Sequence, residues 1–79
     1  MQALSRRDLL ALLNWELSAY EECGGCQFTS IRSMLDRDDA GANWFDARVQ
    51  SDHPLGVEEH FIVRRVVEET RRRFELAAS

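Results

Sequence analysis

The sequence predicts an α+β fold with two layers, in the order helix, strand, strand, helix, in which the strands form an antiparallel hairpin. Apolar residues recur at helical spacing over 4–23 and again over 55–76. Between these stretches, apolar and polar residues alternate over 45–50, which is the period of a strand with one buried face. Because each element has one apolar side to bury, we expect both helices to pack on one face of the hairpin.

The first helix is predicted to begin at Arg6. Ser5 and Asp8 have the spacing of a capping box, in which the Ser5 side chain accepts a bond from the first turn. The apolar stripe that follows consists of Leu9, Leu13, Leu17 and Tyr20. The pair Gly24–Gly25 is expected to end this helix, because glycine adopts the left-handed conformation of a C-cap without a steric penalty.

The two strands are predicted at 27–35 and 45–50. In the second of these, Phe45, Ala47 and Val49 are expected to face the helices. Residues 27–35 also fit helical spacing, but their Thr, Ser and Ile content favours a strand. The polar segment 36–41 ends in glycine and is predicted to connect the strands as a hairpin loop.

The second helix is predicted over 55–76. Its apolar side consists of Ile62, Val63, Val66, Val67, Thr70 and Phe74. Glu58 and Glu59 lie near its start and Arg71–Arg73 near its end, which complements the helix dipole.

Size and composition predict one small domain over 1–79. Of the 79 residues, 44% are apolar and 30% charged, as in an ordinary globular protein. A chain this short buries only about 60% of the surface that its unfolded form exposes, so its core is marginal. A second subunit would enlarge that core, and we expect a homodimer.

The compact motif Cys23–Cys26, with the pattern CxxC, leaves three interpretations open. Two thiolates could form half of a zinc site, with His53 and His60 as further ligands, although the histidine spacing departs from that of common zinc fingers. A second interpretation is a thiol redox pair. The third is structural, with Cys23 as a small buried residue and Cys26 leading into the hairpin.

The redox interpretation meets an electrostatic objection. The cysteines follow a helix, so the negative end of the helix dipole, together with Glu21 and Glu22, should raise a thiol pKa and suppress nucleophilicity. We find no catalytic motif elsewhere, and therefore expect no catalytic residues, no enzyme activity and no cofactor, with zinc as the alternative.

Nucleic acids and membranes are not expected partners. Arg71–Arg73 form a basic cluster, but glutamates share its helix and the net charge of −4 provides no basic field for phosphates. The longest uncharged apolar run, Leu9–Leu13, has five residues, against about 20 needed to cross a bilayer. It is also too short for a secretory signal, so we expect a cytoplasmic protein.

Trp44 and Arg48 are the predicted partner-binding residues. If Phe45, Ala47 and Val49 face the helices, the alternation places Trp44 and Arg48 on the opposite side of the hairpin. Tryptophan and arginine are enriched among interface hot spots, so that face is a candidate dimer or partner surface. The alternative is a register shift of one residue, which would bury Trp44 in the core.

Four short motifs resemble a set of short proteobacterial proteins with CxxC-x-F and G-x-Asn-Trp motifs. These motifs lie at Asn14–Leu17, Glu21–Phe28, Gly41–Trp44 and Arg72–Phe74. The resemblance spans most of the chain and implies no particular activity. Members of that set often carry a further cysteine before the Asn-Trp pair and more cysteines after it, whereas this chain has Ala42 there and none later. The resemblance therefore weakens the zinc interpretation.

Taken together, the sequence favours a non-enzymatic bacterial interaction or regulatory module that self-associates. A zinc-binding regulatory domain and a thiol redox protein are the alternatives.

Overall fold

The computed structural model describes residues 2–34 and 42–77 and confirms the α+β fold, with a hairpin and two helices in the predicted order. In chain order, its elements are β1 (Gln2–Leu4), α1 (Arg6–Leu17), the 3-10 turn η1 (Glu21–Cys23), β2 (Cys26–Ser33), β3 (Trp44–Ser51), α2 (Val57–Arg73) and β4 (Phe74–Leu76). The predicted hairpin loop at 36–41 lies outside the described residues.

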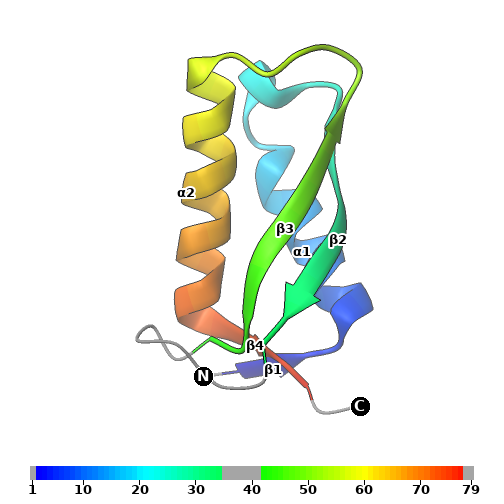
Figure 1. Cartoon of the computed structure of the whole chain (residues 1–79), viewed down its shortest axis with the longest axis vertical. Coiled ribbons are helices and arrows are strands. Elements are labelled where there is room, and N and C mark those ends of the chain that lie inside the picture. Colours follow the sequence, from blue (N-terminus) through cyan, green and yellow to red (C-terminus); the bar gives the residue numbers. More distant parts are fainter. Residues whose placement is uncertain (1, 35–41, 78–79) are drawn as a thin grey trace.

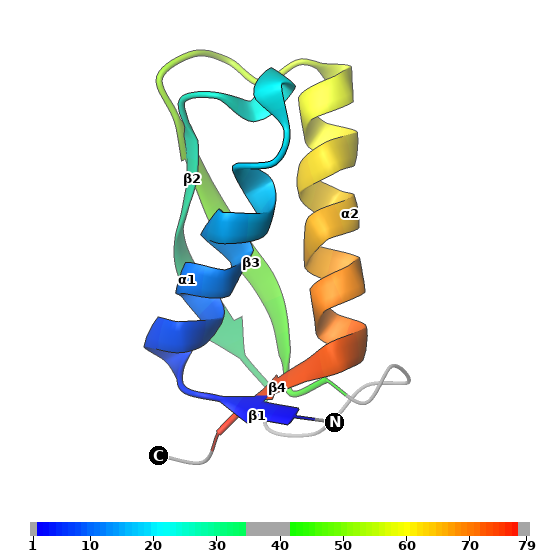
Figure 2. The same cartoon turned by 180° about the vertical axis from the view of Figure 1, so that it is seen from behind.

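The hairpin of β2 and β3 lies in front of α1, while α2 runs beside β3 (Figures 1 and 2). β2 and β3 pair antiparallel, so the ambiguous segment forms a strand, as predicted, and this strand spans Cys26–Ser33. The short strands β1 and β4 form a separate parallel pair, which the sequence analysis did not predict. Neither α1 nor α2 has the length and apolar character that crossing a membrane requires.

The start of α1 agrees with the prediction and its end does not. The backbone N–H of Asp8 donates to Ser5 Oγ at 3.1 Å, which caps a helix that begins at Arg6. The helix then ends at Leu17, and the chain continues through η1 before entering β2. Gly25, with a φ of 85°, turns the chain into β2 instead of capping α1.

Trp44 is buried in the core, so its predicted exposure is wrong and the alternative holds. In the strand register, the backbone of Arg32 lies opposite that of Asp46, and the backbone of Ser33 lies opposite that of Trp44. Phe45, between Trp44 and Asp46, is therefore an extra residue on β3. Such a β-bulge reverses the alternation locally. It places Trp44 at 0% exposure, while Phe45, predicted to face the helices, is 44% exposed.

Asn43 and Trp44 join the start of β3 to β4. The Trp44 indole N–H donates to the Phe74 carbonyl at 3.1 Å. The Asn43 amide makes two bonds to Leu76, accepting from its N–H at 2.7 Å and donating to its carbonyl at 3.0 Å. Phe74 thus begins β4 instead of continuing the predicted helix, and α2 ends at Arg73.

The buried core draws on both helices and both strands of the hairpin. Its apolar members are Leu9, Leu13, Leu17, Cys23, Phe28, Ile31, Ala42, Trp44, Val66 and Leu76. The apolar side of the second helix is less deeply buried, since only Val66 and Thr70 of α2 are buried while Ile62, Val63 and Val67 are half-buried. This side of the core therefore remains partly open, between α2 and β3.

Replacing Trp44 with phenylalanine is expected to lower the free energy of unfolding by about 1–3 kcal/mol, because it removes buried volume and leaves the Phe74 carbonyl without its indole donor. Phe61→Leu is the control at an exposed aromatic residue, since Phe61 is 66% exposed, and it should change the stability by less than about 0.5 kcal/mol. Urea denaturation followed by circular dichroism measures both. Equal effects of the two substitutions would contradict the burial of Trp44.

Candidate interaction site

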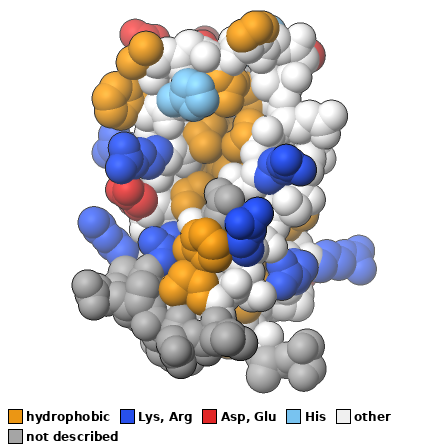
Figure 3. Space-filling view, viewed as in Figure 1, with side chains coloured by type: hydrophobic (Ala, Val, Ile, Leu, Met, Phe, Trp, Pro, Cys, Tyr) orange, Lys and Arg blue, Asp and Glu red, His pale blue; other side chains and the backbone are white. Residues whose placement is uncertain are grey.

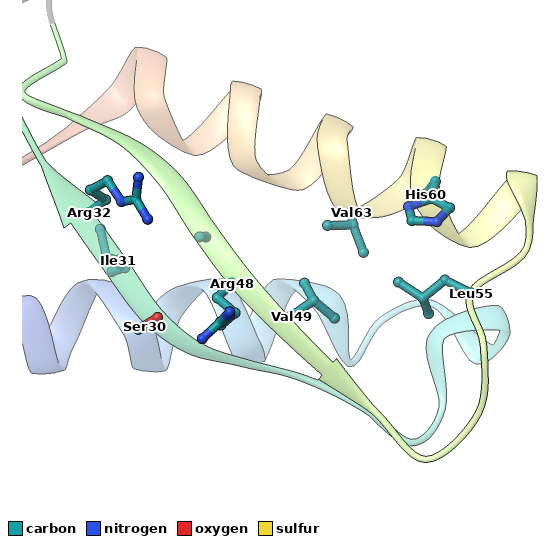
Figure 4. Close-up of a pocket in the computed structure, with 9 residues that line it drawn as sticks. Ser30, Ile31, Arg32, Arg48, Val49, Leu55, His60 and Val63 are labelled. Carbon is teal, nitrogen blue, oxygen red and sulfur yellow. The ribbon is translucent and has the colours of Figure 1, made fainter.

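A groove runs between β3 and α2 on the face of the molecule shown in Figure 3, where hydrophobic side chains follow the middle of the face and cationic side chains flank them. The apolar lining residues come from β2, β3, α2 and the segment that connects β3 to α2: Ile31, Phe45, Ala47, Val49, Leu55, Val63 and Val67. In the close-up of Figure 4, Val49, Leu55 and Val63 lie around the gap between strand and helix, with His60 beside them.

Four of the chain's ten basic residues line this groove, namely Arg32, Arg48, Arg64 and Arg71. Arg64 pairs with Glu68 at 3.3 Å, and Arg71 Nε donates to the Trp44 carbonyl at 2.8 Å. The groove is therefore a cationic region on a protein whose net charge is −4.

Arg32 and Arg48 have no carboxylate partner among the side chains that the structure describes. The Arg32 guanidinium carbon lies 5.8 Å from the centre of the Phe45 ring, within the range of a cation–π contact. Arg48 projects from the exposed side of β3. These two cations are thus available to a ligand in the groove.

Of the two predicted partner-binding residues, only Arg48 lies on an accessible surface. The Trp44 carbonyl accepts a hydrogen bond from Arg71, which lines the groove, while the Trp44 side chain lies in the core. The predicted pairing of Trp44 and Arg48 on one outer face is therefore wrong, because the bulge at Phe45 separates them.

The outer edge of β2 is closed by polar side chains of α1. Asn14 makes two bonds to Phe28: its Oδ1 accepts from the Phe28 N–H at 2.7 Å, and its Nδ2 donates to the Phe28 carbonyl at 3.1 Å. Arg6 donates to the carbonyl of Ile31 on the same edge. The amide of Asn14 thus occupies the place that a neighbouring strand would take.

The outer edge of β3 is open at Val49 and Ala47, whereas Arg71 already bonds the Trp44 carbonyl at the start of the strand. Phe28 pairs with Val49, and since both main-chain groups of Phe28 point away from β3, this is a non-hydrogen-bonded pair of the antiparallel ladder. The N–H and carbonyl of Val49 therefore point away from β2. Main-chain groups two residues apart on a strand point to the same side, so the N–H and carbonyl of Ala47 also point away from β2, toward the groove. Among the described residues, no hydrogen bond to them is found outside the hairpin.

A second apolar surface feature lies on the side of the molecule formed by α1 and α2. This side faces the viewer in Figure 2. Trp15 of α1 is 71% exposed. It borders a hollow whose other lining residues come from the end of α1, the turn after it and α2: Glu16, Ser18, Ala19, Tyr20, Val66 and Glu69. Trp15 was not among the residues predicted from the sequence to bind a partner.

The four candidate metal ligands do not converge in the described part of the chain. Cys26 Sγ lies 3.7 Å from Ser51 Oγ. The His53 ring faces the carboxylates of Asp52 and Glu59, whereas His60 lines the groove. Within residues 2–34 and 42–77, no three Cys, His, Asp or Glu side chains are arranged to hold a metal ion. The described residues thus give the zinc alternative no geometric support.

Cys23 is buried, as the structural interpretation predicted, and neither cysteine is in a disulfide. Burial raises the pKa of the Cys23 thiol, and the neighbouring Cys26, Glu59 and Glu22 raise this pKa further. The direction agrees with the sequence-based expectation, but the main cause is desolvation. A thiol with a raised pKa carries little thiolate at neutral pH and is a poor nucleophile.

Comparison with protein-family models, curated proteins and solved structures found no match to this chain. The interaction site therefore stands on the geometry alone.

Part of the groove could have been found in the sequence. His60, Arg64, Val67 and Arg71 recur at helical spacing, and all four line the groove from α2. The role of Asn14 had no such signal, because its two bonds depend on how α1 lies against β2.

The pKa of Cys23 predicts a loss of stability at alkaline pH. The unfolded thiol ionises near pH 8.5, whereas the folded thiol keeps its proton to higher pH. The stability contribution is thus complete below about pH 8.5 and is lost as the pH rises through the folded pKa.

Urea midpoints measured between neutral pH and pH 10 should therefore fall for the wild type and fall less for Cys23→Ala, with Cys26→Ala as the control that keeps most of the decline. Identical slopes for the wild type and Cys23→Ala would contradict the raised pKa.

Proposed function

We propose that this protein is a small non-enzymatic interaction module that forms a homodimer through the seam between α1 and α2 around Trp15. The observation that carries the proposal is the exposed Trp15 indole beside a hollow formed by both helices.

Trp15 and its hollow suit a two-fold symmetric interface. In such an interface the same patch is used by both copies, so a projecting group must find a recess on the same surface. The indole of one copy can enter the hollow between Ala19 and Val66 of the other, and reciprocally. Buried tryptophan is among the side chains that contribute most to binding energy at interfaces.

The charges around the seam are also self-complementary. Arg65 Nε lies 3.2 Å from a Glu69 carboxylate oxygen, and Arg73 lies 3.7 Å from Glu16. Because Glu16 and Glu69 line the hollow and arginines lie next to them, a two-fold axis can place acidic groups of one copy beside arginines of the other. Such an arrangement aligns the copies without accumulating like charges.

The small core supplies the energetic reason for association. A chain of 79 residues buries a smaller share of its apolar surface than a larger domain does. Covering Trp15 in a partner adds an aromatic side chain of about 150–250 Å² to the buried surface. Self-association thus stabilises each copy as well as joining them.

Trp15→Ala is expected to weaken the dimer by about 2–4 kcal/mol, which is a rise of roughly 30-fold or more in the dissociation constant, because the indole is the central apolar group of the seam. Sedimentation velocity over a range of protein concentrations measures this constant. Phe61→Ala is the matched control, since Phe61 is 66% exposed on α2 and does not border the hollow.

A wild-type protein that sediments as a monomer at high micromolar concentration would refute the proposed dimer. Equal weakening by Trp15→Ala and Phe61→Ala would refute its assignment to this seam.

A further inference from the structure

We propose that the groove between β3 and α2 binds an extended acidic segment of another protein, which joins the hairpin as an added strand beside β3. This surface is separate from the dimer seam, because the seam lies between α1 and α2 whereas the groove is bounded by the hairpin and α2. The inference therefore holds for a monomer and for a dimer alike.

The open edge of β3 favours a strand as the ligand. The outward N–H and carbonyl groups of Val49 and Ala47 point into the groove, and an extended chain can satisfy them with its own main chain. Peptide recognition by strand addition uses these main-chain bonds for affinity and side-chain pockets for specificity.

The apolar lining indicates how such a strand would be oriented. Successive side chains of an added strand point to opposite faces, so every second one enters the groove. There it would meet Leu55 and Val63 on the side away from β3, as Figure 4 shows for the residues around the gap. The ligand thus needs apolar residues at alternate positions.

The arginines select the charge of the remaining side chains. Arg48 and Arg32 rise from the hairpin without carboxylate partners among the described residues. Carboxylates at the outward positions of an added strand would reach these guanidinium groups. Charge-assisted bonds of this kind are stronger than neutral ones and give specificity.

A second copy of this chain and a nucleic acid fit the groove less well. Pairing two β3 edges would bring the Arg48 and Arg32 side chains of both copies together, and like charges across an interface are unfavourable. A nucleic acid would meet a protein of net charge −4, and its phosphates would leave the outward N–H and carbonyl groups of Val49 without strand partners.

The test uses a short peptide of alternating valine and glutamate, titrated into isotopically labelled protein and followed by amide chemical shifts. We expect saturable shifts at Val49, Ala47 and Val63, and binding that weakens as ionic strength rises. A valine–lysine peptide should not bind. Trp15→Ala should bind the valine–glutamate peptide as the wild type does, which separates this inference from the proposed dimer.

Arg48→Glu is expected to weaken binding of the valine–glutamate peptide by at least about tenfold, since it places a carboxylate opposite the peptide's carboxylates. Arg7→Glu is the matched control: it makes the same change of charge at an exposed position in the first turn of α1, outside the groove. Because an acidic residue is favourable at a helix N-terminus, the control should fold normally.

Two N-methylated peptides test strand addition itself. An extended peptide directs its even-numbered and odd-numbered amides to opposite edges, so only one alternate set can bond to β3. Methylation of that set should abolish binding, and methylation of the other set should preserve it.

Three results would overturn the inference. They are no saturable binding of the valine–glutamate peptide at millimolar concentration, equal effects of Arg48→Glu and Arg7→Glu, and undiminished binding of both methylated peptides. The inference would also be overturned if oligothymidylate bound in an Arg48-dependent way and the peptide did not, because the groove would then be a nucleic-acid site.

Discussion

The structure depends on how a hairpin of only two strands satisfies its two edges. A main-chain edge that is buried without partners is costly, and one that is exposed is a template for another strand. Asn14 closes the edge of β2 from within the chain, because its single amide both donates to and accepts from Phe28. Within the part of the chain that the structure describes, no equivalent side chain closes β3 at Val49, so one edge is completed internally at Phe28 and the other faces a groove at Val49.

A second asparagine side chain also bonds both main-chain groups of one residue, at the other end of the hairpin. Asn43 bonds both main-chain groups of Leu76 and so joins β3 to the short strand β4. Each asparagine precedes a tryptophan, yet Trp44 is buried and Trp15 is largely exposed. The buried tryptophan stabilises the fold, and the exposed one is available for contact between copies. The same two-residue motif thus has a structural and a proposed interaction role in one chain.

Periodicity was sufficient to predict the fold class, the order of the two helices and the two hairpin strands, and the start of α1, because each depends on local spacing or on the Ser5 cap. It did not predict β1 and β4, which are only three residues long. The side of the hairpin on which Trp44 lies was not predictable from alternation, since one extra residue at Phe45 reverses it. Part of the groove was visible in the sequence as a stripe of residues on α2. The open edge of β3 was not, because the direction of its main-chain groups is known only from the bonds between Asn14 and Phe28 and from the pairing of Phe28 with Val49. The position of the groove site therefore depends on tertiary contacts and not on local sequence pattern.

Amide hydrogen exchange of the free protein, resolved by residue, tests the unequal edges most directly. The account predicts that the Phe28 amide, bonded to Asn14, exchanges at least about tenfold more slowly than the amides of Val49 and Ala47, and that Asn14→Ala removes this difference. A Val49 amide that exchanges as slowly as that of Phe28 in the wild type would show that the edge of β3 is already closed and would contradict the account.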